Sequence, residues 1–377
     1  MALATSTLTP AAASKPSWNP LKFGSTDLPT GLLIMVKSLA LVLLLTNHVR
    51  ILPDPWLPFV PGVDLIPPVL FQRTLQTVFI VSALAVLFNR HVRLASLVLG
   101  STMLLAVLSS KAYYGNNKTF CGLMFFLTGL SAPGTRPFVR WQLGITYFGA
   151  GLNKLLDTDW HSGVFFENWA VNRLHHSWYI ALDSMLPPLF LGRLVCWTTI
   201  MTELGVVPCI FIRRVYYWAI CANILFQSSL LLFTGTTFTL FFYSMTAASL
   251  AFVNWPEGPL HVMYDTRRGL ARRARRASEL LDMEGKLAWT PVEVGMNFRG
   301  WLELRNGGSR WTGFRALRTI VLFNPLTYLV IAGLIAIAPD GTGWSALYRR
   351  VIVSSCLTLL MPPLAWIVDR LFPDDAR

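Results

Sequence analysis

Long apolar stretches separated by short polar loops dominate the chain. A helix needs about 20 mostly apolar residues to cross a bilayer. Eight stretches approach that length, and we expect spanning helices near residues 31–52, 68–88, 93–113, 119–132, 138–155, 188–212, 215–235 and 237–254. Two further stretches are ambiguous, because 326–338 holds only thirteen residues and 351–372 is interrupted by Pro362 and Pro363.

The basic residues between these stretches indicate an orientation. Lys and Arg concentrate in cytoplasmic loops, and the basic loops alternate along the chain once Lys15 and Lys22 are placed inside. The other basic residues that then fall inside are Arg90, Arg93, Arg136, Arg140, Arg213, Arg214 and those after residue 255. We therefore expect a cytoplasmic N-terminus and a cytoplasmic 255–320 module. Residues 1–30 are small, polar and Pro-rich, and we expect them to form a disordered tail.

The segment 156–187 is a long external stretch rich in Trp and His, and it holds Trp160, His161, Trp169, His175, His176 and Trp178. Because Trp prefers the membrane interface, we expect an interfacial or re-entrant helix that covers the outer mouth of the bundle. No carboxylate or Cys completes a metal-ligand spacing with the histidines, so we predict no metal site.

The pattern changes after Trp255-Pro256. Residues 261–269 predict a strand and turn, 271–285 a helix ended by Gly285, 286–292 a second strand, and 298–313 a hairpin around Asn306-Gly307-Gly308. The predicted fold class is an all-α polytopic membrane bundle of about eight transmembrane helices with a small C-terminal cytoplasmic α/β module. The expected boundaries are 31–256 for the bundle, 257–353 for the module and 354–377 for a hydrophobic, membrane-associated end.

Composition agrees with a membrane protein, because only 14% of the 377 residues are charged, against about 25% in soluble domains. The net charge of +13 is densest in one predicted helix and its preceding turn, at Arg267, Arg268, Arg272, Arg273, Arg275 and Arg276. These arginines predict contact with anionic lipid headgroups or with an acidic partner surface. We expect no nucleic-acid binding, because no aromatic interleaving or nucleic-acid module accompanies them. The five cysteines form no CxxC pair, so neither a disulfide framework nor a zinc site is predicted.

The most specific motif runs from residue 147 to residue 163. It reads Tyr147-Phe148-x-Ala150-Gly151-Leu152-Asn153-Lys154-Leu155, then Asp157-x-Asp159-Trp160-x-x-Gly163. With this motif, Asn116-Asn117, Glu203 and Trp255-Pro256, residues 31–256 resemble the membrane domain shared by vitamin K-dependent γ-carboxylase and its bacterial relatives, the HTTM family. The resemblance implies a multi-pass protein of the bacterial inner membrane.

In the carboxylase, the lysine at the position of Lys154 deprotonates vitamin K hydroquinone. The resemblance therefore makes Lys154 a candidate catalytic base and a quinone or hydroquinone its cofactor. Gly144, Gly151 and Lys154 fall roughly on one helix face. Small residues there either leave room for a flat ring or let another helix pack closely. The alternative for Lys154 is an amine that snorkels to the interface.

The resemblance also implies a ligand-binding role for Asn117, Gly151, Trp160 and Glu203. Two departures disfavour the same carboxylation reaction: Lys118 follows Asn117 where the family has His, and residues 226–229 lack the family's His in the seventh span. Glu203 is a functional candidate because it is an intramembrane carboxylate. A structural role, as a partner of Arg193 or of a polar cluster, is the interpretation we favour.

Residues 260–318, extending toward 353, resemble the DCC family, a thioredoxin-like module often joined to HTTM domains. The family's YDGxCxxC hallmark corresponds to YDTRRGLA at 264–271, where Arg268 and Ala271 occupy the cysteine positions. Later features persist at Gly307-Gly308 and Trp311-x-Gly313-Phe314. Thiol–disulfide exchange is excluded, because the module has no thiolate at these positions to attack a disulfide.

Two function classes therefore stay open. One is an HTTM-family membrane protein with a quinol- or lipid-binding pocket near Lys154. The other is a non-catalytic accessory or scaffold subunit that docks a partner through the arginine-rich module. A transporter is disfavoured, because the sequence lacks internal repeats and paired broken helices.

Overall fold

The computed structural model describes most of the chain between residues 26 and 337. The described residues are 26–50, 62–111, 113–131, 137–212, 214–234, 239–251, 255, 259–282, 285–292, 298, 300–306 and 309–337. Helices account for most of them, and one small sheet lies near the C-terminal end of the described part. The predicted tail before residue 26 and the predicted segments 351–372 and 354–377 lie outside the described residues.

Each of the eight apolar stretches forms a helix. They are α1 (Thr30–Leu45), α2 (Pro68–Leu87), α3 (Val92–Ser109), α4 (Asn116–Leu130), α5 (Pro137–Leu156), α9 (Phe190–Phe211), α10 (Tyr216–Thr234) and α11 (Thr239–Leu250). A short 3₁₀ turn, η2 (Val63–Leu65), precedes α2. The helix starts agree with the expected ones within a few residues, whereas several helices end earlier than expected, as α1 does at Leu45.

The expectation of eight spanning helices is not supported. Within the described residues, three helices are long and apolar enough to cross a membrane: α2, α3 and α9. A fourth is possible if α13 (Gly313–Leu322) and α14 (Pro325–Ile337), which bend by 74° at their junction, count as one span. Helices α1, α4 and α11 have 16, 15 and 12 residues, which is shorter than the ~20 residues that a bilayer requires.

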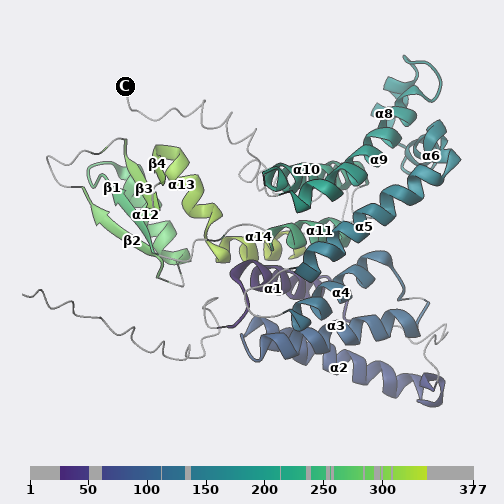
Figure 1. The fold of residues 1–377 in the computed structure, drawn as a ribbon, viewed down its shortest axis with the longest axis horizontal. Coiled ribbons are helices and arrows are strands. Elements are labelled where there is room, and N and C mark those ends of the chain that lie inside the picture. Colours follow the sequence, from purple (N-terminus) through teal and green to yellow (C-terminus); the bar gives the residue numbers. More distant parts are fainter. Residues whose placement is uncertain are drawn as a thin grey trace, which may run out of the picture.

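The helices pack side by side as a bundle, in which α1 lies against α2, α4, α11 and α14 (Figure 1). Helices α2, α3 and α4 form one flank, and α5, α9, α10 and α11 form the other. Every residue from Gly31 to Ala40 of α1 is buried, and a helix that is apolar all round belongs in the centre of a bundle. One polar exception is Lys37, whose buried ammonium donates to the carbonyl of Leu87, 2.8 Å away, at the end of α2.

Helix α14 joins this bundle. It packs against α1, and its buried Tyr328 and Ala332 belong to the same apolar core as α1. This stretch fell within the expected 257–353 module, and the sequence left open whether it spans the membrane. The structure packs α14 against α1, and the 74° bend between α13 and α14 leads out to the sheet (Figure 1).

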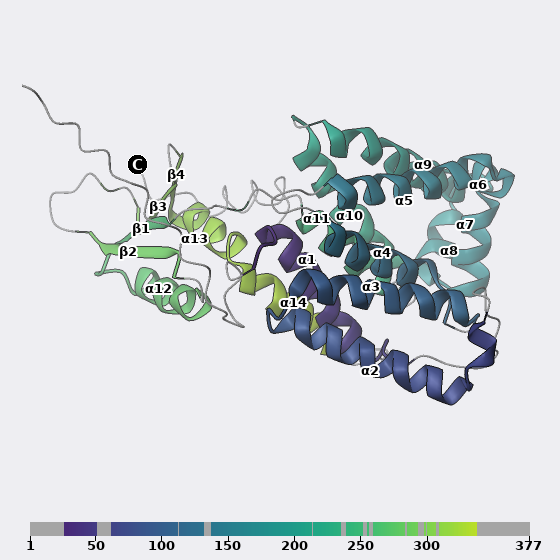
Figure 2. The same ribbon diagram turned by 60° about the horizontal axis from the view of Figure 1, so that its bottom comes forward.

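The segment 156–187 forms four short helical pieces at one end of the bundle (Figure 2). They are α6 (Thr158–Ser162), α7 (Val164–Asn168), a π-helical turn η3 (Trp169–Arg173) and α8 (Ser177–Asp183). Both α6 and α7 pack against α9. Phe166, Ala170 and Tyr179 form a small apolar core with Cys196 of α9. We call this segment the cap, and its helical character agrees with the sequence prediction.

The arginine-rich region folds as a small mixed sheet with two helices, at the opposite end of the molecule from the cap (Figure 2). The strands β1 (Leu260–Tyr264), β2 (Leu287–Pro291), β3 (Leu302–Asn306) and β4 (Ser309–Thr312) lie in the order β2-β1-β3-β4. Strands β1 and β2 are parallel across α12 (Gly269–Leu281), whereas β3 and β4 form an antiparallel hairpin. The predicted βαβ unit and hairpin are therefore both present.

Candidate functional site

Lys154 and Glu203 form an ion pair between α5 and α9. The Lys154 ammonium donates to both carboxylate oxygens of Glu203, at 2.8 and 2.7 Å. The side chains are 20% and 7% exposed, so the charges lie largely out of solvent. Glu203 pairs with Lys154, whereas the sequence suggested Arg193 or a polar cluster as its partner.

Trp160 completes the surroundings of the amine. The Lys154 nitrogen lies 5.1 Å from the centre of the Trp160 ring, within the range of a cation–π contact. The local sequence explains the approach, because Asp157 caps α6 by accepting from the backbone N–H of Asp159. This cap turns the chain directly after α5. Trp160 in turn stacks on Phe165, with ring centres 4.3 Å apart.

The glycine face of α5 is closed by α9. A Cβ added at Gly151 would lie 2.8 Å from the side chain of Leu204 and 3.3 Å from Cβ of Glu203. One added at Gly144 would lie 3.1 Å from the ring of Phe211. Of the two interpretations of these glycines, the structure shows the second: they let another helix pack closely. The close approach is also what brings Glu203 within reach of Lys154.

A second close backbone contact fixes the cap to α9. Gly163 adopts φ +87°, and a Cβ there would lie 2.4 Å from the backbone nitrogen of Arg193. The left-handed conformation and the missing side chain are both needed at this corner. Nearby, the Tyr179 hydroxyl donates to Glu167 at 2.6 Å. Burial, followed by this hydrogen bond to Glu167, raises the pKa of Tyr179, so the phenol stays a donor.

A buried polar seam continues inward from the ion pair. The hydroxyl of Tyr147, which belongs to the same motif as Lys154, donates to Oδ1 of Asn223 and accepts from Gln227 at 2.8 Å. Asn223 then donates to the hydroxyl of Ser249 at 2.6 Å. The seam links α5, α10 and α11. Asn223 and Ser249 were not among the predicted site residues, although polar residues within apolar helices are the signal that could have identified them.

Asn117 belongs to a different cluster. Its Oδ1 accepts from the backbone N–H of Lys118 at 2.8 Å, and Lys118 donates to the Tyr113 carbonyl at 2.9 Å. The Tyr113 hydroxyl donates to the carbonyl of His48, in the turn that follows α1. Burial, and then the charge of Lys118, lower the pKa of His48. His48 therefore lies in the same cluster as Lys118, although the two are far apart in the sequence, and this proximity was not predicted.

The cap histidines gather no metal-ligand set. Within the residues that the structure describes, no group of three or more His, Cys, Asp or Glu side chains could hold a metal ion. His161 stacks on Trp197 at 5.4 Å and His176 contacts Trp178 at 5.8 Å. These ring contacts fit side chains that pack at a membrane interface.

The arginine-rich helix α12 has two distinct faces. Ala271, Ala274 and Ser278 are buried against the sheet, and the opposite face exposes Arg272, Arg273, Arg276 and Leu280. We call these four residues the arginine face. Arg275 lies beside it and donates to Glu279 at 2.7 Å. Arg268 pairs with Asp265 at 3.9 Å in the turn before the helix, and Arg267 is exposed there.

The arrangement at Lys154 constrains its chemistry. Its nitrogen already donates to both carboxylate oxygens of Glu203, so it would have to leave this partner before it could contact a ligand. Comparison with known proteins gives no further assignment, because no family model, no curated protein and no solved structure matches the chain. The HTTM and DCC resemblances therefore stay predictions.

Proposed function

We propose that this chain is a multi-pass membrane protein without catalytic chemistry of its own, which acts as an accessory subunit by docking an acidic partner protein on the arginine face of α12. The arginine face is the observation that carries the proposal. It places three exposed arginines around Leu280, which is 76% exposed. Arginine is enriched in protein interfaces and at the residues that contribute most to binding.

The state of Lys154 supports the non-catalytic part of this proposal. Its ammonium donates to both oxygens of Glu203, and side chains of α9 occupy the space beside the neighbouring glycines. The site therefore serves to join α5 to α9. The two His positions that differ from the carboxylase pattern argue in the same direction.

The module fits a docking role as well. We propose that it is a thioredoxin-like fold of the DCC type whose frame persists while Arg268 and Ala271 stand at the cysteine positions. The βαβ unit and the hairpin support this proposal. A module that keeps its frame and lacks its thiols retains a surface for binding. We further propose that it faces the cytoplasm of a bacterial cell.

Crosslinking mass spectrometry on membranes tests the docking proposal. We expect a stoichiometric partner whose acidic residues crosslink near α12. The partner should be lost when Arg272, Arg273 and Arg276 are all changed to Glu, and retained when all three are changed to Lys. Binding of the purified protein to anionic vesicles is measured in parallel. Absence of a partner, or a charge-dependent effect on vesicle binding alone, would overturn protein docking.

A second candidate function is binding of a quinol-like or lipid ligand beside Lys154. The buried ion pair and the seam at Tyr147 favour it, because buried polar groups in a membrane bundle are costly and commonly functional. A proton passing from Lys154 to Glu203 would give a neutral amine and a neutral acid without changing the net charge. The test is quinone retained after detergent purification, compared between the natural protein and Lys154→Ala. Equal retention in both would end this candidate.

A further inference from the structure

Two helices of spanning length carry an exposed arginine close to their first residue. Arg73 is the sixth residue of α2, and Arg193 is the fourth residue of α9. Both side chains are exposed, although both helices are long and apolar enough to cross a membrane. Among the residues that the structure describes, neither guanidinium forms an ion pair or a hydrogen bond. Charges on membrane helices are costly and are usually compensated, so each arginine requires a counter-charge from outside the chain.

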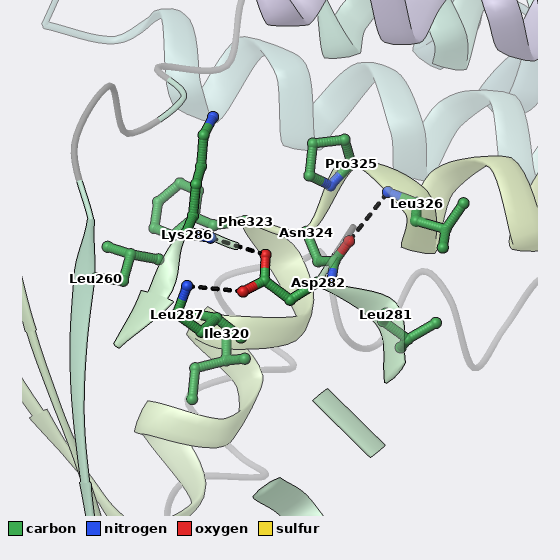
Figure 3. Close-up of a pocket in the computed structure, with 10 residues that line it drawn as sticks. All are labelled: Leu260, Leu281, Asp282, Lys286, Leu287, Ile320, Phe323, Asn324, Pro325 and Leu326. Atoms are coloured by element: carbon green, nitrogen blue, oxygen red, sulfur yellow. Dashed lines mark hydrogen bonds between the residues drawn. The ribbon is translucent and has the colours of Figure 1, made fainter. Parts of the chain in front are cut away.

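Polar side chains at the other end of the molecule are compensated inside the protein. Figure 3 shows them where the end of α12 and the start of β2 meet the α13–α14 bend. The Asp282 carboxylate accepts from the backbone N–H groups of Lys286 and Leu287, at 3.0 and 2.7 Å. Oδ1 of Asn324 accepts from the N–H of Leu326 at 3.0 Å and caps the start of α14. The two arginines differ from these groups in facing outward.

The two arginines lie at the same end of the bundle. Figure 2 shows that the start of α2 lies at the end that carries the cap, and α9 begins directly after the cap. Helix α3 packs against α2 and ends at this level, because Phe71 of α2 and Val107 of α3 share one apolar cluster. Lys111 follows the end of α3 and is exposed. Each of α2, α3 and α9 therefore has a basic residue at this end.

Exposed apolar side chains lie on both sides of each arginine along its helix. Val69 and Leu70, about one turn before Arg73, are 56% and 58% exposed, and Ile80 and Val81 beyond it are exposed as well. This pattern places Arg73 within a surface that lipid chains cover, rather than in a polar surface that faces water.

The surroundings of Arg193 follow the same pattern. Phe190 and Leu194 are 51% and 53% exposed on either side of it. A group that compensates Arg193 must therefore also be compatible with apolar neighbours.

The depth of the arginines matches the membrane surface. With a rise of about 1.5 Å per residue, Arg73 lies about 7.5 Å and Arg193 about 4.5 Å beyond the first residue of its helix. Helical side chains lean toward the N-terminus, and a long basic side chain keeps its stem on apolar surface while its charge reaches the interface. The 20 residues of α2 match a hydrocarbon core of about 30 Å. Both guanidinium groups therefore reach the level of the lipid phosphates.

We propose that Arg73 and Arg193 bind phosphate groups of phospholipids in the leaflet at the cap end of the bundle. A guanidinium matches a phosphate with two parallel hydrogen bonds, and the acyl chains of the same lipid cover the apolar side chains beside each arginine. A carboxylate on a neighbouring membrane helix is the other possible counter-charge. The phospholipid is favoured because it supplies both the charge and the apolar cover. This proposal rests on the proposed multi-pass membrane placement of the chain.

Native mass spectrometry of the full-length protein in detergent tests the phosphate contact. The protein is offered phosphatidylglycerol and diacylglycerol with the same acyl chains, so that the two lipids differ in the phosphate headgroup. We expect phosphatidylglycerol adducts to exceed diacylglycerol adducts several-fold. The double variant Arg73→Gln with Arg193→Gln should lose most of this preference. The double Lys variant should keep much of it, because lysine also binds phosphate, as a point charge.

Arg267→Gln is the control for the change in net charge. Arg267 is exposed in the turn before α12, at the opposite end of the molecule from the cap, so this variant should keep the preference. An unchanged preference in the double Gln variant, or an equal loss with Arg267→Gln, would overturn the proposal. So would a stoichiometric membrane protein that co-purifies with the natural chain and is lost in the double Gln variant while the lipid adducts stay.

The outcomes also separate this proposal from the proposed function. If the multi-pass placement is wrong, the natural protein is released from membranes by carbonate without detergent, before any lipid is tested. If only the phosphate contact is wrong, the protein stays in the membrane fraction and shows no headgroup preference. The docking test depends on Arg272, Arg273 and Arg276, none of which is changed here.

Discussion

Glu203 in the bundle and Glu303 in the sheet module are both buried carboxylates, but their charges are compensated by different neighbours. In the bundle, Glu203 is 7% exposed and meets a single amine, Lys154, which is itself only 20% exposed. In the module, Glu303 is fully buried and meets two guanidinium groups, Arg305 at 2.5 Å and Arg310 at 2.6 Å. Those two arginine side chains are 47% and 41% exposed.

The two sites differ in whether the basic side chains can reach water once the carboxylate is removed. The arginines of the module reach water, so each can be hydrated without Glu303. Lys154 has little access to water, and its charge depends on Glu203 for compensation. The module pair is also local to one hairpin, whereas the bundle pair joins helices that lie far apart in the sequence. We therefore expect loss of the Lys154–Glu203 pair to lower the stability of the whole bundle, and loss of Glu303 to affect mainly the β3–β4 hairpin.

The largest expected effect comes from Glu203→Leu. It leaves the Lys154 ammonium buried without its partner, and breaking such a pair costs about 3 kcal/mol or more. The double variant Lys154→Met with Glu203→Leu should recover most of this loss, because an apolar pair of similar volume is often neutral. Thermal unfolding in detergent measures both. A double variant as unstable as the single one would contradict the role of an unpaired charge.

The glycine face offers the next largest effect. Gly151→Ala brings a Cβ within 2.8 Å of the Leu204 side chain, so either this side chain must shift or α5 and α9 must move apart. We expect a loss of about 1–2 kcal/mol. Gly149→Ala on the same helix is the control, because nothing lies within 4 Å of its added Cβ. Higher helix propensity should make that change neutral or stabilising. The unfolding midpoint should fall for Gly151→Ala and should stay the same or rise for Gly149→Ala.

Glu303→Gln should have a smaller effect than the loss of Glu203. It removes two charge-assisted hydrogen bonds but leaves both arginines able to contact water, so we expect a loss of about 1 kcal/mol. The difference from the natural protein should shrink in high salt, because the exposed arginines are screened. Hydrogen exchange of the β3–β4 backbone checks this. A loss as large as that of Glu203→Leu would remove the contrast between the two regions.

The smallest expected effect is a pH dependence at His48. Its pKa is lowered in the folded state, first by burial and then by the charge of Lys118, while a hydrogen bond to Thr46 acts the other way. The unfolded chain therefore binds the proton more readily. Stability should be complete above the ordinary histidine pKa of about 6.5 and should fall as the pH drops through the folded value.

Unfolding midpoints at pH 7.5 and pH 5.5 measure this dependence. Tyr113 and Lys118 are the other titratable groups that contact this turn, through the Tyr113 hydroxyl and the charge of Lys118. His48→Gln should reduce the difference between the two pH values, because the variant has no imidazole to protonate. A difference of the same size in the variant would assign the pH dependence to other groups.

Much of the fold could be predicted from local pattern. The eight bundle helices, the helical cap, the βαβ unit and the hairpin all follow from apolar runs, Gly and Pro positions and strand alternation, which act over a few neighbouring residues. The number of spans was wrong, because a run such as 31–52 ends as a helix at Leu45. The sequence left the position of α14 open, because thirteen apolar residues do not reveal which surface they will cover.

The sequence by itself determined where most helices and strands form and that the chain is rich in membrane-compatible helices. The family resemblance grouped Lys154 with Asn117, Gly151, Trp160 and Glu203. Only the tertiary structure decided that Lys154 meets Glu203, that the glycines admit α9, and that Asn117 lies with His48 and Lys118 instead. The physical reason is distance along the chain. Helix formation depends on neighbours a few residues away, whereas an ion pair between α5 and α9 depends on how two finished helices pack.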